Sequence, residues 1–148
     1  MEPKYQNVYY GAYGSNLHMK QMLARCPWSC TRDSIALKDY RLVFRGVADI
    51  EPCKGSEVPI GLWRITDICE KALDRYEGFP NLYDKEIIDL PDFNGGSQVM
   101  VYRMVDQDTI YPPSSWYLDS LIQGYKDFGF DPEYLKNAVQ DSFTRETA

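Results

Sequence analysis

Tyr13-Gly14-Ser15-Asn16-Leu17 lies between a strand-like aromatic run, Asn7 to Tyr13, and a helical run, Leu17 to Arg25. A strand that turns into a helix leaves the first helical N–H groups unpaired, and these groups can hold a carboxylate or polarise a carbonyl. We expect Gly14 to adopt a positive φ and to let a ligand approach closely, and Ser15 or Asn16 to cap the helix. The alternative is an ordinary capped turn that binds nothing.

Glu77 ends a second expected helix, which Thr66-Asp67 caps and which runs to about Tyr76. A carboxylate is unfavourable at the negative end of a helix. Apolar and aromatic residues follow it at 79, 80, 82 and 83. Burial among them would raise the pKa of Glu77 toward that of a general acid or base. The alternative is a solvated glutamate before a glycine C-cap at Gly78.

The composition indicates a globular domain that binds neither nucleic acid nor membrane. At 148 residues with 44% hydrophobic residues, the chain fits a single domain over residues 1–148. A net charge of −6 argues against binding a nucleic-acid backbone. No apolar run approaches 18 residues, so we expect no membrane span. Met1-Glu2-Pro3-Lys4 does not resemble a signal peptide, and we expect a cytoplasmic protein.

The cysteines and the histidine indicate no metal, redox or triad chemistry. Cys26 and Cys30 have three residues between them rather than the two of thioredoxin-like motifs, and Cys53 and Cys69 stand apart. We therefore expect free, reduced thiols, with a metal or disulfide role as the alternative. His18 is the only histidine, so a zinc site lacks ligands and a Ser–His triad lacks a convincing base. We expect His18, on the first helix, to lie at the surface or to support the site without contacting the substrate.

Short strands and a helical C-terminal part predict an α+β fold. Asn94-Gly95-Gly96 predicts a hairpin. We expect one C-terminal helix that is capped at Ser114 or Ser115 and ends at Gly129. Asp131-Pro132-Glu133 predicts the start of the next helix. Strands without regular intervening helices suit a small mixed β-barrel with flanking helices. The predicted strands are Ser34–Leu37, Arg41–Phe44, Val47–Ile50, Val58–Ile65, Tyr83–Leu90 and Gln98–Val105, with a turn-rich loop at 51–56.

Three stretches together resemble the gamma-glutamylcyclotransferase-like (AIG2-like) family. They are the YGSNL stretch at 13–17, Leu73-Asp74-x-x-Glu77-Gly78 followed by Tyr83, and a C-terminal part that contains Pro112-Pro113-Ser114, Tyr117, Gly124 and residues 129–135. The resemblance covers roughly residues 7 to 140. It implies a small β-barrel with flanking helices and closure of a γ-glutamyl group to 5-oxoproline, with release of an amino acid or amine. It implies a small-molecule substrate and no metal or organic cofactor.

The resemblance also implies roles for individual residues. The turn would hold the γ-glutamyl part, and Glu77 would carry the proton from the substrate amine to the departing nitrogen. From the residues themselves, we expect the segment 78–82 to shape the leaving-group side of the pocket, where Phe79 and Pro80 hint at an apolar wall. The alternative is a protein that binds a small ligand on the same fold without catalysis. Neither the leaving group nor the oligomeric state is indicated. The implied substrate-binding residues are Tyr13, Gly14, Ser15, Asn16, Leu17, Tyr83, Tyr102 and Tyr117.

Overall fold

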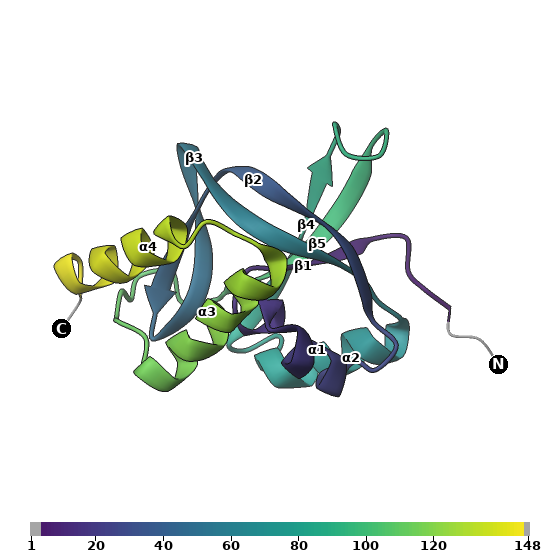
Figure 1. Cartoon of the computed structure of the whole chain (residues 1–148), viewed down its shortest axis with the longest axis horizontal. Helices are drawn as coiled ribbons and strands as arrows, with labels where there is room; N and C mark the ends of the chain where they lie inside the picture. Colours follow the sequence, from purple (N-terminus) through teal and green to yellow (C-terminus); the bar gives the residue numbers. More distant parts are fainter. Residues whose placement is uncertain (1–3, 147–148) are drawn as a thin grey trace.

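A computed structural model describes residues 4–146, in which one five-stranded sheet is combined with four α-helices (Figure 1). This confirms the predicted α+β class. In these residues, no helix is long and apolar enough to cross a membrane. The elements in chain order are β1 (Tyr9–Ala12), the 3-10 turn η1 (Ser15–Leu17), α1 (Met19–Arg25), β2 (Cys30–Arg45), β3 (Val47–Arg64), α2 (Asp67–Glu77), β4 (Tyr83–Leu90), β5 (Ser97–Met104), α3 (Ser115–Phe128) and α4 (Glu133–Thr144).

The sheet is open, so the expected barrel is not confirmed. The strand order is β2-β3-β1-β5-β4, which leaves β2 and β4 as the two edges. Only β1 and β5 run parallel among the described strands, and the other neighbours are antiparallel. The short strand β1 therefore lies at the centre and joins the β2–β3 hairpin to the β4–β5 hairpin. The residues that follow β1 leave the middle of the sheet.

The β2–β3 hairpin replaces four strands that the sequence predicts as separate. β2 and β3 pair along their whole length through a tight turn at Gly46, which has a φ of +80°. The predicted loop at 51–56 belongs to β3: residues 53–56 bulge opposite Asp39, whose side chain accepts a hydrogen bond from the Gly55 N–H. Asp39 and Gly55 both adopt a positive φ, which lets the two strands bend without separating. The turn-forming residues thus mark a bulge rather than a loop.

Several helix ends match their predictions, but the buried faces differ. The Thr66 side chain caps α2, Ser114 caps α3, and Gly78 and Gly129 end these helices in the left-handed conformation. The sequence predicts one apolar stripe on each of these helices, and both stripes are wrong at their outer positions. The predicted stripes consist of Ile68, Ala72, Leu73 and Tyr76 in α2 and of Trp116, Leu118, Leu121, Ile122 and Tyr125 in α3. Ile68 and Trp116 are each 80% exposed, because α2 buries Cys69 and Leu73 instead, and α3 buries Leu121, Gly124 and Tyr125.

The turn after β1 is held by close packing against α3. Leu17 is fully buried beneath Gly124 of α3, where an added Cβ would lie 2.5 Å from the Leu17 Cβ. No side chain other than hydrogen fits this contact. Figure 1 shows α1, α2 and α3 on one side of the strands and α4 beside the long hairpin. The packing of Leu17 therefore fixes the turn between the sheet and α3.

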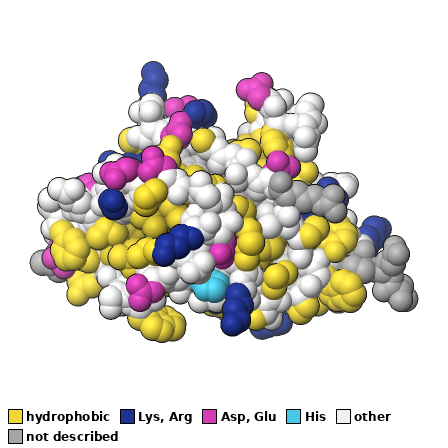
Figure 2. All heavy atoms as spheres, viewed as in Figure 1, with side chains coloured by type: hydrophobic (Ala, Val, Ile, Leu, Met, Phe, Trp, Pro, Cys, Tyr) yellow, Lys and Arg dark blue, Asp and Glu magenta, His cyan; other side chains and the backbone are white. Residues whose placement is uncertain are grey.

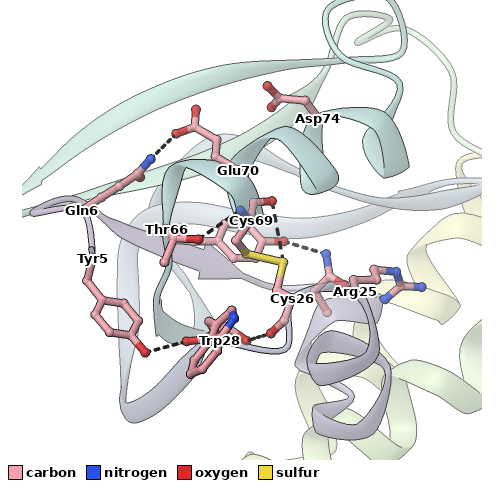
Figure 3. The surroundings of a disulfide bond; sticks show 12 residues. Tyr5, Gln6, Arg25, Cys26, Trp28, Thr66, Cys69, Glu70 and Asp74 are labelled. Carbon is pink, nitrogen blue, oxygen red and sulfur yellow. Dashed lines mark hydrogen bonds between the residues drawn. A yellow bond between two sulfur atoms is a disulfide. The ribbon is translucent and has the colours of Figure 1, made fainter. Parts of the chain in front are cut away.

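A disulfide joins α1 to α2, which contradicts the expectation of four free thiols. Cys26, directly after α1, is bonded to Cys69 of α2, whereas Cys30 and Cys53 are free (Figure 3). The expectation rested on the spacing of Cys26 and Cys30 along the chain. The relevant distance is spatial, because α1 and α2 pack side by side and bring residues 43 positions apart together.

Candidate active site

A small cavity of about 120 Å³ lies where β1, the end of α2, and residues of β4, β5 and α3 meet. Eight of the nine predicted site residues line it: Tyr13, Gly14, Ser15, Asn16, Glu77, Tyr83, Tyr102 and Tyr117. Leu17, the ninth, does not line the cavity, because its side chain is packed in the core. The fold therefore brings together residues that are more than one hundred positions apart in the sequence.

The turn at Gly14 differs in detail from its prediction. Gly14 has φ −119° and ψ −134°, so a positive φ is not the reason for glycine here. The reason is space: an added Cβ would lie 3.2 Å from the Tyr117 hydroxyl and 3.3 Å from the Ala48 Cβ. The helix also begins two residues later than expected. His18, rather than Ser15 or Asn16, caps α1 by accepting a hydrogen bond from the Gln21 N–H.

Ser15 and Asn16 instead fasten the turn to its surroundings. The Ser15 hydroxyl is 2.8 Å from the Tyr76 hydroxyl, and the Asn16 amide donates to the Tyr10 hydroxyl at 3.0 Å. The backbone N–H groups of Ser15 and Asn16 have no acceptor among residues 4–146, as expected for the first turn of a helix. The turn is therefore a fixed wall of the cavity that carries unpaired hydrogen-bond donors.

The Glu77 carboxyl is the only charged group in the cavity wall, within the described residues. Glu77 is the last residue of α2, and Gly78 ends the helix with a φ of +67°, which turns the chain away after it. Burial raises the pKa of Glu77 from its ordinary value of 4.5 to about 7, against the opposing effect of the Arg25 charge. No hydrogen bond in the described part of the chain involves this carboxyl, so it is available to a ligand.

The predicted tyrosines line the cavity mainly as a rigid wall, because most of their hydroxyl protons are already donated. Tyr83 donates to the Ala48 carbonyl at 2.6 Å, Tyr13 to the Tyr102 carbonyl at 2.6 Å, and Tyr102 to Asp74 at 2.7 Å. Burial raises the pKa of Tyr13, Tyr83 and Tyr102, so these phenols stay neutral.

Tyr117 differs from the other predicted tyrosines in the direction of its hydrogen bond. Its hydroxyl accepts from the Ala48 N–H at 3.0 Å and lies beside Gly14. Within residues 4–146 its own proton has no acceptor. Burial raises the pKa of Tyr117, so the phenol keeps this proton at neutral pH. Tyr117 can therefore donate to a ligand held at the turn.

Sequence reasoning missed part of the wall, and of the segment 78–82 that it expects on the leaving-group side, only Leu82 lines the cavity. Tyr76 and Leu82 line the cavity while remaining 44% and 50% exposed, so they form its outer part. The prediction assigned Tyr76 to the buried stripe of α2. Phe79 and Pro80 do not line the cavity; the Phe79 ring packs against the Lys85 ammonium instead, at 4.3 Å. The other lining residues that were missed are Tyr10, Gly11, Val47 and Ala48.

A larger hollow of about 800 Å³ lies between α3 and α4 and contains none of the predicted site residues. Figure 2 shows hydrophobic side chains gathered over this region, with basic side chains at its margin. Its lining includes no acidic residue and no histidine. Within residues 4–146, no group of three or more His, Cys, Asp or Glu side chains is arranged to hold a metal ion. The smaller cavity around Glu77 is therefore the candidate active site.

Comparison with known proteins relates the chain to one family. The family model described as gamma-glutamyl cyclotransferase, AIG2-like, matches residues 10–118, which include all the predicted site residues. A gamma-glutamylcyclotransferase from Bos taurus is 26% identical over 145 residues, covering 88% of this chain and 77% of that protein.

Solved structures have the same arrangement of elements. A structure named gamma-glutamyl cyclotransferase superposes with a TM-score of 0.76 at 25% identity, covering 88% of this chain and 85% of that one. An uncharacterized protein from Homo sapiens superposes with a TM-score of 0.74 at 24% identity, with the same two coverages. The second likeness concerns the fold alone.

Proposed function

Because the chain belongs to the gamma-glutamyl cyclotransferase, AIG2-like family, we propose that it cyclises the γ-glutamyl part of a small molecule to 5-oxoproline and releases an amino acid or amine. The observation that carries this proposal is the Glu77 carboxyl. It faces the cavity without a hydrogen-bond partner in the described residues, and its pKa is raised to about 7. A carboxyl that titrates near neutral pH both accepts and returns a proton readily.

The reaction needs no nucleophile from the protein. The α-amine of the substrate attacks its own γ-carbonyl carbon, a new C–N bond closes the ring, and the original C–N bond to the leaving group breaks. An α-ammonium has a pKa of about 8, so Glu77 as carboxylate takes a proton from the amine. Glu77 then returns the proton to the departing nitrogen. Since both reacting groups belong to one molecule, holding them in a reactive conformation supplies much of the rate.

The turn and Tyr117 supply hydrogen-bond donors for the substrate oxygens in this proposal. The backbone N–H groups of Ser15 and Asn16, and the Tyr117 hydroxyl proton, have no acceptors within the described residues and border the same cavity. Donors that point at a carbonyl oxygen stabilise the charge that develops there during ring closure. The tyrosine rings of the wall exclude water from the closing ring.

The test is release of 5-oxoproline, measured by mass spectrometry, from a panel of γ-glutamyl amino acids and γ-glutamyl amines. We expect the wild-type chain to release it from at least one panel member, and Glu77→Gln to lower kcat by at least 100-fold with little change in substrate binding. Glu133→Gln, which removes an exposed carboxylate in α4, is the matched control and should retain full activity.

Two results would overturn the proposal. If correctly folded Glu77→Gln released 5-oxoproline at the wild-type rate, the proton would travel by another route. If the wild-type chain bound a γ-glutamyl compound but released no 5-oxoproline from any panel member, the chain would be a small-ligand binding protein on this fold.

A further inference from the structure

Arg25 does not line the cavity, yet it contacts both elements that define the candidate site. It is the last residue of α1, where a cation is favoured by the helix dipole, and its side chain is partly buried. One guanidinium nitrogen donates to the Asn16 side-chain carbonyl at 2.6 Å. The guanidinium also lies 3.6 Å from the centre of the Tyr76 ring. Arg25 therefore touches the turn and the end of α2 at once.

These two contacts suit arginine better than lysine. A guanidinium is planar, so it can lie on an aromatic ring while its N–H groups donate in the plane. A second nitrogen donates to Gln21 at 3.4 Å, one helical turn earlier in α1, which orients the side chain. Tyr76 is in turn hydrogen-bonded to Ser15 through its hydroxyl. The contacts thus run in a ring between the turn and α2, from Asn16 to Arg25, on to Tyr76 and back to Ser15 beside Asn16.

The backbone beside Arg25 is anchored to α2 as well. Cys26 follows Arg25 directly and is bonded to Cys69, two helical turns before Glu77 (Figure 3). The disulfide limits how far the end of α1 moves relative to α2. The guanidinium is therefore held close to the end of the helix that carries Glu77.

We propose that Arg25 is a positioning residue, which fixes the turn at 14–16 against the end of α2 and places a fixed positive charge beside the Glu77 carboxyl. This inference rests on the proposed function. It assigns to Arg25 a role in the reaction without direct contact with the substrate.

The electrostatic part of this role depends on which groups surround Glu77. Arg25 is the charged group that acts on the Glu77 carboxyl, and it lowers the pKa of Glu77 against the larger effect of burial. Around the cavity, burial raises the pKa of the neighbouring phenols, so they remain neutral between pH 5 and 9. These phenols, which face Glu77, are those of Tyr10, Tyr13, Tyr83, Tyr102 and Tyr117. Tyr76, on the same helix as Glu77, also lines the cavity, and its hydroxyl is hydrogen-bonded to Ser15.

The test compares Arg25→Gln and Arg25→Lys by the pH dependence of kcat/KM. Removing an opposite charge at close range raises a carboxyl pKa by roughly one unit. For Arg25→Gln we therefore expect the acidic limb to move from about pH 7 to roughly pH 8, which lowers kcat/KM about fivefold at pH 7. Because the guanidinium contacts are lost as well, we also expect a several-fold rise in KM that remains at every pH. Arg25→Lys keeps the charge but not the planar stacking. We expect its limb to stay near pH 7 while KM rises several-fold.

A matched control and a direct titration separate this inference from the proposed function. Lys20→Gln removes one exposed positive charge from the same helix and should leave the pH profile unchanged. The Glu77 carboxyl can also be titrated by NMR in protein labelled with 13C-glutamate, with Glu77→Gln to assign the signal. If the wild-type chain released no 5-oxoproline, the proposed function would fail, and the NMR titration would still test Arg25.

Two outcomes would overturn the role of Arg25. In the first, Arg25→Gln keeps the wild-type acidic limb and the wild-type NMR pKa of Glu77. In the second, Arg25→Gln raises KM only for substrates whose leaving group has a carboxylate, with no change for γ-glutamyl alkylamides. That result would make Arg25 a substrate-binding residue.

Discussion

Glu77→Gln should stabilise the protein at neutral pH while it removes turnover. Burial raises the pKa of Glu77 from 4.5 to about 7, so the folded state binds this proton more tightly than the unfolded state does. Tighter binding of this proton stabilises the folded state. This contribution is complete below about pH 4.5 and is lost as the pH rises through about 7. A difference of 2.5 units at about 1.36 kcal/mol each gives an upper limit of about 3.4 kcal/mol.

The expected gain is smaller than this limit because the Glu77 side chain is only partly buried and solvent screens its charge. We expect Glu77→Gln to be about 2–3 kcal/mol more stable than wild type at pH 8 and nearly equal at pH 4.5. For a chain of this length that corresponds to a rise in Tm of roughly 5–10 °C at pH 8.

Urea denaturation of both proteins between pH 4.5 and 8.5 measures this difference. Other titrating groups are shared, so they cancel when the two free energies of unfolding are subtracted. Glu133→Gln, which removes an exposed carboxylate, is the control for the loss of a surface charge. A constant difference between Glu77→Gln and wild type from pH 5 to 8 would refute the argument, because it would mean that Glu77 titrates alike in both states.

Two further predictions concern the framework of the site. Gly124→Ala places a Cβ 2.5 Å from the Leu17 Cβ and should lower the free energy of unfolding by about 1–3 kcal/mol; a urea denaturation midpoint equal to that of wild type would show that the contact can relax freely. Breaking the Cys26–Cys69 bond, which has a sequence separation of 43, should lower that free energy by about 4 kcal/mol on the chain-entropy estimate. Denaturation with and without reductant measures the second effect, and identical curves would exclude the bridge.

Local signals predicted the parts of the fold that are determined locally. Thr66 and Ser114 accept hydrogen bonds from the N–H groups of Cys69 and Tyr117, as N-caps do, and Asn94-Gly95-Gly96 connects β4 to β5. Glu77 could be selected because a carboxylate at a helix C-terminus opposes the helix dipole. That conflict is visible in the sequence before any packing is known.

The predictions that failed concern features that depend on contacts between distant segments of the chain. Nothing near Cys26 in the sequence indicates that Cys69 is its partner rather than Cys30, because the packing of α1 on α2 decides it. Residues 51–56 have turn-forming composition, yet they interrupt the strand only as a bulge at 53–56, because Asp39 of the opposite strand accepts a hydrogen bond from the Gly55 N–H and pairing resumes at Glu57. Arg25 carried no signal, since its role depends on contacts with Asn16 of the turn and with Tyr76 near the end of α2, which only the packing of these elements brings together.

Under the proposed function, the distribution of free hydrogen-bonding groups makes a single carboxyl enough at this site. Tyr13, Tyr83 and Tyr102 have already donated their hydroxyl protons to other parts of the protein, so they give the cavity its shape without taking part in proton transfer. The remaining groups divide by function: the turn and Tyr117 offer donors, and Glu77 offers an acceptor. An intramolecular ring closure requires this division, because the substrate brings both its nucleophile and its electrophile. Burial destabilises the ionised Glu77 carboxyl, and the same burial keeps its pKa near neutral. The protein would therefore gain stability by replacing Glu77 and would lose the group that titrates near neutral pH.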